Sequence, residues 1–88
     1  MTDREITRSL REAALKGATP VEIADLLDAL CDRGLSQTTL VACFKRAFPS
    51  VPLRTLLDAG GWHRIGSAGM TDEEFNELLA PWLPSAGV

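Results

Sequence analysis

The residues best suited to bind a metal or catalyse a reaction are one histidine, His63, and two cysteines, Cys31 and Cys43. A structural zinc site takes four ligands, mostly cysteine and histidine, at short and regular spacings. Here the two cysteines lie far apart and the histidine is farther still, which matches no known ligand spacing. We therefore expect neither a metal nor another cofactor.

Catalysis by His63 would need a neighbouring group that orients its ring. The residue beside it is Arg64, whose positive charge disfavours a protonated imidazole. Candidate acids, bases and nucleophiles do not converge elsewhere in the chain, so we expect a protein that is not an enzyme. We expect His63 to face solvent or to form hydrogen bonds within its loop.

The stretch "GSAGMT", residues 66–71, is a glycine-rich turn before a helix, where backbone amides can hold a phosphate group. The three residues that follow it, Asp72, Glu73 and Glu74, are all acidic. Their carboxylates already interact with the positive end of that helix and would repel an anion. The sequence therefore argues against a phosphate site.

Trp62 directly follows two glycines at the end of a predicted helix. A hydrophobic residue at such a place commonly packs back onto the last helical turn, so we predict a core position for it. The alternative is contact with a protein partner, since tryptophan is frequent at binding hot spots. His63 and Arg64, beside it, are candidates for the same contact.

Two stripes of like charge are the other candidate binding features. Arg4, Arg8 and Arg11 share one face of the first predicted helix, because residues four and seven apart lie on the same side. The second helix carries an acidic stripe that consists of Glu22, Asp25, Asp28 and Asp32. Both stripes could simply be solvated faces. Alternatively, the acidic stripe binds a basic partner, or the two stripes pair head to tail between copies of the chain.

The elements that position these residues are predicted from their start and stop signals. Thr2 with Glu5, Thr19 with Glu22 and Thr71 with Glu74 have the spacing of a capping box, and Ser36 can cap a further helix. Glycines and prolines mark the helix ends. The predicted helices are 3–16, 20–33, 37–48, 51–59 and 72–80.

Apolar residues recur at helical spacing in each of these segments, and no segment alternates as a half-buried strand does. We predict that Leu53, Leu56 and Leu57 are buried and that Trp82 and Leu83 fold back onto the core. The expected fold is all-α, a compact bundle of about five short helices.

Composition indicates one globular domain, because the chain has 88 residues, 45% hydrophobic and 24% charged. We place the domain at 1–84 and a flexible C-terminal tail at 85–88. A net charge of −3 disfavours binding to nucleic acid and to anionic membranes. Without a recognisable signal peptide or a long apolar run, we expect a cytoplasmic protein whose cysteines stay reduced and buried.

One stretch, "LREAALKGATPVEIADLL" followed by "GLSQTTLVACFKRAF", is similar to the helix-turn-helix families of DNA-binding proteins. It spans residues 10–48 and departs from the family pattern by the additional residues "DALCDR" before the turn. The resemblance implies that Gln37, Thr38 and Thr39 meet base edges and that Lys45 and Arg46 meet phosphates.

Together these observations favour a small non-catalytic module or adaptor that binds a protein partner, or its own copy, through charged helix faces. An immunity-type or regulatory partner of a larger protein would fit this description. DNA binding of the helix-turn-helix kind is the alternative.

Overall fold

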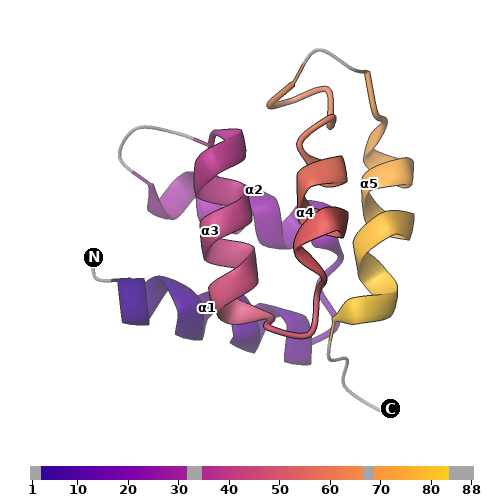
Figure 1. Ribbon diagram of the computed structural model, residues 1–88. Coiled ribbons are helices and arrows are strands. Elements are labelled where there is room, and N and C mark those ends of the chain that lie inside the picture. Colours follow the sequence, from indigo (N-terminus) through magenta and orange to yellow (C-terminus); the bar gives the residue numbers. More distant parts are fainter. Residues whose placement is uncertain (1–2, 32–34, 67–68, 84–88) are drawn as a thin grey trace.

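The computed structural model, shown in Figure 1, describes residues 3–31, 35–66 and 69–83. Five α-helices and one short 3-10 helix account for most of these residues. They are α1 (Asp3–Leu15), α2 (Pro20–Leu30), α3 (Gln37–Ala47), α4 (Leu53–Ala59), α5 (Asp72–Leu79) and η1 (Ala80–Trp82). Within the described ranges the only β-type pairing is an isolated bridge between Trp62 and Met70. The all-α prediction is confirmed.

Side-chain caps begin three of the helices at the predicted residues. Thr19 and Glu22 form a capping box before α2, and Thr71 and Glu74 form one before α5. In each box the threonine hydroxyl accepts from the glutamate N–H, while the glutamate carboxylate accepts from the threonine N–H. Ser36 caps α3 by accepting from the N–H of Thr39 at 3.2 Å. The capping box predicted for Thr2 lies outside the described residues.

The predicted end of the second helix is wrong. α2 ends at Leu30, three residues earlier than expected, because Cys31 turns to an extended conformation. A carboxylate oxygen of Asp28 then accepts the N–H of Leu35 at 2.8 Å, which links the last turns of α2 to the residue before the cap of α3. The predicted stop at Gly34 lies outside the described residues.

α4 also differs from its prediction, since it begins at Leu53 and not at residue 51. Pro52 is extended, with ψ 143°, and stands before the helix instead of in its first turn. Val51 is fully buried and its N–H donates to the carbonyl of Phe48 at 3.0 Å. The turn after α3 therefore contributes a core residue of its own, which delays the start of α4.

The remaining ends shift by a single residue. α1 ends at Leu15, and Gly17 follows with a φ of +92°, the left-handed conformation that favours glycine at a helix end. α3 ends at Ala47, where Phe48 is the cap, and α5 passes at Leu79 into η1, which contains Pro81. Proline fits there because it lies at the start of a new turn.

The helices form a closed ring of neighbours. α1 packs on α2 and α3, α3 on α4, α4 on α5, and α5 returns to α2. In Figure 1, α3, α4 and α5 stand side by side, α2 passes behind α3 and α4, and α1 runs across below α3. Residues far apart in the sequence thus meet, such as Asn76 in α5 and Val21 in α2.

The ring encloses one apolar cluster that extends along the chain from Ile6 to Leu79. Among the described residues, no polar or charged residue is buried. Phe44, Trp62 and Phe75 are its largest fully buried side chains. Burial of such side chains is the main favourable contribution to folding.

Three side chains predicted to be inside are not. Leu53 and Leu57 are each 52% exposed, because α4 turns its other side, Leu56 and Ala59, toward the core. Trp82 is 42% exposed, whereas Leu83 does pack against the core. No helix in the described ranges is long and apolar enough to span a membrane. The predicted tail, 85–88, lies outside the described residues.

Candidate functional site

The loop between α4 and α5 is held by its own backbone. The N–H of His63 donates to the carbonyl of Met70 at 2.9 Å, and the N–H of Met70 donates to the carbonyl of Gly61 at 3.0 Å. These two bonds flank the bridge between Trp62 and Met70. These backbone bonds fix the positions of residues 61–63 relative to Met70.

Trp62, in the middle of this bonded segment, is fully buried. Its ring stacks on that of Phe75, with the centroids 4.1 Å apart and the planes 20° apart. Stacked aromatic pairs of this kind stabilise the core beyond the area that they bury. Trp62 has the predicted core position and offers no surface to a partner in this conformation.

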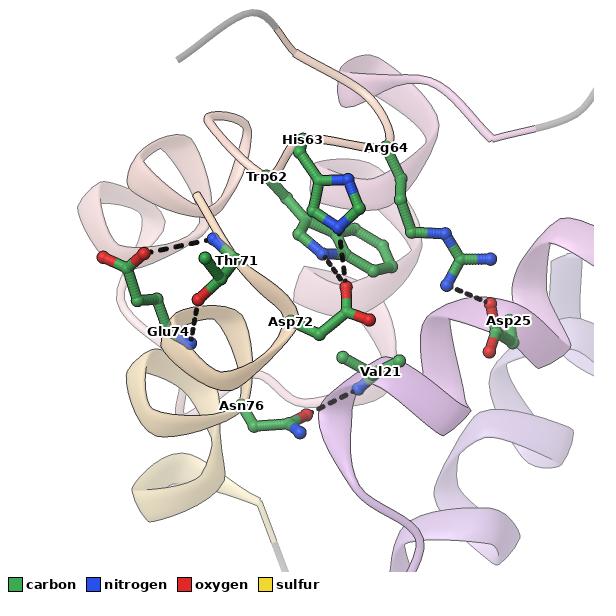
Figure 2. Close-up of polar contacts among 9 residues, drawn as sticks. All are labelled: Val21, Asp25, Trp62, His63, Arg64, Thr71, Asp72, Glu74 and Asn76. Atoms are coloured by element: carbon green, nitrogen blue, oxygen red, sulfur yellow. Dashed lines mark hydrogen bonds and ion pairs between the residues drawn. The ribbon is translucent and has the colours of Figure 1, made fainter. Parts of the chain in front are cut away.

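Asp72 connects the loop to the start of α5, as Figure 2 shows. One of its carboxylate oxygens accepts from the indole N–H of Trp62 at 2.7 Å and lies 2.9 Å from Nε2 of His63. These hydrogen bonds, that of Trp62 first, hold the pKa of Asp72 below its ordinary value. Sequence reasoning placed Asp72 only at a helix start, and its pairing with His63 was not foreseen.

Arg64 joins the same cluster from the other side. Its guanidinium carbon lies 4.9 Å from the centroid of the Trp62 ring, and it pairs with Asp25 of α2 at 2.6 Å. Asn76 of α5 adds a second link to α2, because its side-chain oxygen accepts the N–H of Val21 at 2.8 Å. The predicted contacts Trp62, His63 and Arg64 thus tie the loop to two helices.

The His63–Asp72 pair lies beside an open hollow at the surface. His63 and Asp72 are both about half exposed, and the hollow beside them is lined further by Gly69, Thr71 and Glu73. Glu73 adds a second carboxylate to this lining, and the hydroxyl of Thr71 accepts the N–H of Glu74 in the capping box. In the described part of the chain, no three His, Cys, Asp or Glu side chains gather as a metal site would require.

The acidic stripe of α2 is largely used within the protein. Glu22 closes the capping box, and the hydrogen bonds with Thr19 lower its pKa. Asp25 pairs with Arg64, and Asp28 accepts from Leu35. Asp32 lies outside the described residues. Binding of a basic partner by this stripe stays a prediction, and it would compete with these three contacts.

The arginine stripe is engaged at one end only. Arg11 donates from Nε to the carbonyl of Ala47 at 2.8 Å and from Nη2 to that of Arg46 at 3.3 Å, which caps the end of α3. Arg4 and Arg8 are exposed, and no hydrogen bond or ion pair with another described residue engages them. They line a hollow of about 520 Å³ between α1 and α3.

Carboxylates moderate the charge of this hollow. Asp3 pairs with Arg46 at 2.9 Å, and Glu12 also lines the hollow. Four arginines face these two acids, so the hollow keeps a positive excess that attracts carboxylate groups. We call it the arginine groove, which is lined by Asp3, Arg4, Thr7, Arg8, Arg11, Glu12 and Arg46.

A second hollow of about 520 Å³ begins where the arginine groove ends, and Arg11 lines both. Its other walls are Leu15, Ala47, Phe48, Pro49, Ser50, Trp82 and Leu83. We call it the Trp82 hollow. Leu15, 53% exposed, and Trp82, 42% exposed, are the large apolar side chains that it presents to solvent.

The residues singled out by the helix-turn-helix resemblance are partly occupied. Lys45 donates to the carbonyls of Pro49 and Val51, and Arg46 pairs with Asp3. Gln37 and Thr38 are exposed, and the hydroxyl of Thr39 accepts from that of Ser36 at 3.0 Å. Both cations assigned to phosphates therefore already have partners within the chain.

Comparison with known proteins gave no match to a family model, to a curated protein or to a solved structure.

Proposed function

We propose that this chain is a small, non-catalytic protein-interaction module that binds an acidic protein partner through the arginine groove. The observation that carries the proposal is that Arg4 and Arg8 are exposed, line the arginine groove and form no hydrogen bond or ion pair with another described residue. Other charged candidates, such as Asp25, Asp28 and Arg64, already stabilise the fold.

The distribution of charge supports an acidic partner. Two unpaired guanidinium groups one helical turn apart repel each other, so they do not stabilise α1. A partner carboxylate would relieve that repulsion and would speed the encounter between the two proteins. The module would serve as an adaptor or as a regulatory or immunity-type partner of a larger protein.

We place this function in the cytoplasm. Support comes from Cys43, which is a free, partly buried thiol in the structure, as a reducing compartment would keep it. Burial raises the pKa of Cys43 above its ordinary value, which makes that thiol slow to react.

The experiment compares three immobilised forms of the full chain in nuclease-treated extract of its source cells. These are the wild type, the double variant Arg4→Glu with Arg8→Glu, and the control Arg54→Glu, which reverses an exposed charge on α4 away from the groove. Quantitative mass spectrometry measures the retained proteins.

We expect an acidic protein that wild type and R54E retain and that the double variant loses by about tenfold or more, because buried or adjacent charge pairs contribute that much to binding. Equal retention by the double variant would refute the assignment to the groove. Retention that occurs only in a parallel extract without nuclease treatment would instead favour DNA binding.

A further inference from the structure

The arginine groove and the Trp82 hollow form one continuous surface along α1. Arg4, Arg8, Arg11 and Leu15 are spaced by four, three and four residues, which places all four on one side of the helix. The first three line the arginine groove, and the last two line the Trp82 hollow. The surface thus changes from basic to apolar over roughly 16 Å, at about 1.5 Å per residue.

The apolar end can receive a bulky side chain. Leu15 and Trp82 stand on two sides of the hollow, while Phe48 and Leu83 belong to its walls. Trp82 belongs to η1, so its ring comes from a segment distant in sequence from α1. An aliphatic side chain placed between Leu15 and Trp82 would remove both from water.

From this arrangement we infer that the partner contributes an acidic amphipathic helix that lies antiparallel along α1. This inference rests on the proposed function and names the part of the partner that is bound. An apolar residue of the partner helix occupies the Trp82 hollow, and acidic residues four, seven and eleven positions later face Arg11, Arg8 and Arg4. Residues with that spacing lie on one side of an α-helix, so a single straight helix can contact the Trp82 hollow and all three arginines.

A second copy of this chain does not supply such a segment from its described helices. The carboxylates of α2 are engaged as described. Of the apolar residues of α5, Phe75 and Leu79 are fully buried and Leu78 packs against the core. α4 has exposed leucines but a single carboxylate, Asp58. A nucleic-acid backbone fits this surface less well than an acidic helix, because its phosphates could meet the arginines but it has no apolar side chain for the Trp82 hollow.

The test uses a synthetic peptide with capped ends, built on an alanine-rich helix. It carries leucine at one position and glutamate four, seven and eleven positions later. A control peptide has the same composition with its glutamates moved to the opposite face. Binding to the full-length, nitrogen-15-labelled protein is followed by the backbone and tryptophan side-chain N–H signals.

We expect shifts in residues of α1 and in the indole signal of Trp82, with little change for the buried indole of Trp62. The control peptide, and the variant that carries Arg4→Glu and Arg8→Glu, should each bind at least about tenfold more weakly. Arg54→Glu should bind as the wild type does, and Trp82→Ala should bind more weakly with an unchanged far-ultraviolet circular dichroism spectrum.

Equal binding of the two peptides, shifts that map away from α1, or no binding of either peptide would overturn the inference. Shifts of the same α1 signals on raising the protein concentration without peptide would overturn it too, in favour of self-association. If the peptides fail while the extract experiment still retains an Arg4- and Arg8-dependent protein, the proposed function stands and only the helical form of the partner is refuted.

Discussion

At the scale of single residues, the most informative group is Asp72, because one carboxylate holds the indole of Trp62 and the imidazole of His63. A carboxylate whose pKa is lower in the folded than in the unfolded chain stabilises the fold above its unfolded pKa. That stabilisation is lost as the pH falls through the folded pKa. The protein should therefore lose stability in acid partly through this group.

We expect Asp72→Asn to make the free energy of unfolding less dependent on pH. Asparagine can still accept from the indole of Trp62 but cannot carry the charge, so the variant should be less stable at pH 7. The difference from wild type should shrink as the pH is lowered from about 5 toward 3. Urea unfolding at several pH values measures it, with Asp58→Asn as an exposed control. Parallel curves for wild type and D72N would contradict the prediction.

Phe75 is the second residue whose role can be measured directly. It is fully buried and stacks on Trp62. Replacement by alanine removes the stacked ring and leaves a cavity, so Phe75→Ala should lower the free energy of unfolding by about 3–5 kcal/mol. Phe75→Leu should cost less, because it fills more of the space. Denaturant melts give both values, and a loss below about 1 kcal/mol for alanine would show that the ring contributes little.

At the scale of elements, two glycines, Gly60 and Gly66, lie where the end of α4 and the loop after it are closely packed. A Cβ atom on Gly66 would lie 2.2 Å from the carbonyl oxygen of Gly60, which belongs to the backbone. A Cβ atom on Gly60 would instead lie 2.3 Å from the end of the Gln37 side chain. The Gly60 carbonyl is backbone and cannot move aside, whereas the end of the Gln37 side chain can.

We therefore expect Gly66→Ala to destabilise the protein by about 1–3 kcal/mol, in the range of overpacked sites. Gly60→Ala should cost less, and adding Gln37→Ala should remove most of that cost. Thermal melts of the three single variants G66A, G60A and Q37A, and of Q37A combined with each glycine variant, measure the two effects. If Q37A does not relieve G60A, or if it relieves G66A as well, the assigned clashes are wrong.

Prediction of the elements from sequence succeeded where local chemistry decides and failed where tertiary contacts do. Thr19, Ser36 and Thr71 cap their helices through hydrogen bonds to residues three positions later, so these helix starts can be predicted without a structure. The end of α2 is accompanied by a contact between Asp28 and Leu35, seven residues apart, which no local signal in the sequence predicts. The exposure of Leu53 and Leu57 depends in the same way on which side of α4 meets its neighbours.

The candidate site shows the same division. The arginine spacing on α1 follows from helical geometry alone, and the predicted core position of Trp62 follows from a helix end. The pairing of Asp25 with Arg64 joins residues of α2 and the loop before α5, which only the folded chain brings together. The Trp82 hollow could not be predicted either, because Trp82 was expected to fold inward.

At the scale of the whole molecule, the closed ring of helices and its one apolar cluster predict cooperative unfolding. The variant Trp82→Phe leaves buried Trp62 as the only tryptophan. In this variant, fluorescence and far-ultraviolet circular dichroism should give the same urea midpoint, as expected when a small domain unfolds in one step. Separate midpoints would mean that the α4–α5 side, which holds Trp62, unfolds apart from the rest.

The purely apolar interior of the described chain also has an evolutionary consequence. Such an interior is constrained by volume and water exclusion, so its leucines, isoleucines and phenylalanines can replace one another in combination over long divergence. The capping threonines accept a short set of substitutes, serine, aspartate and asparagine, and the glycine beside the Gly60 carbonyl accepts fewer still. In distant descendants of this chain, identity should therefore persist at the helix starts and at Gly66 after it has faded from the core.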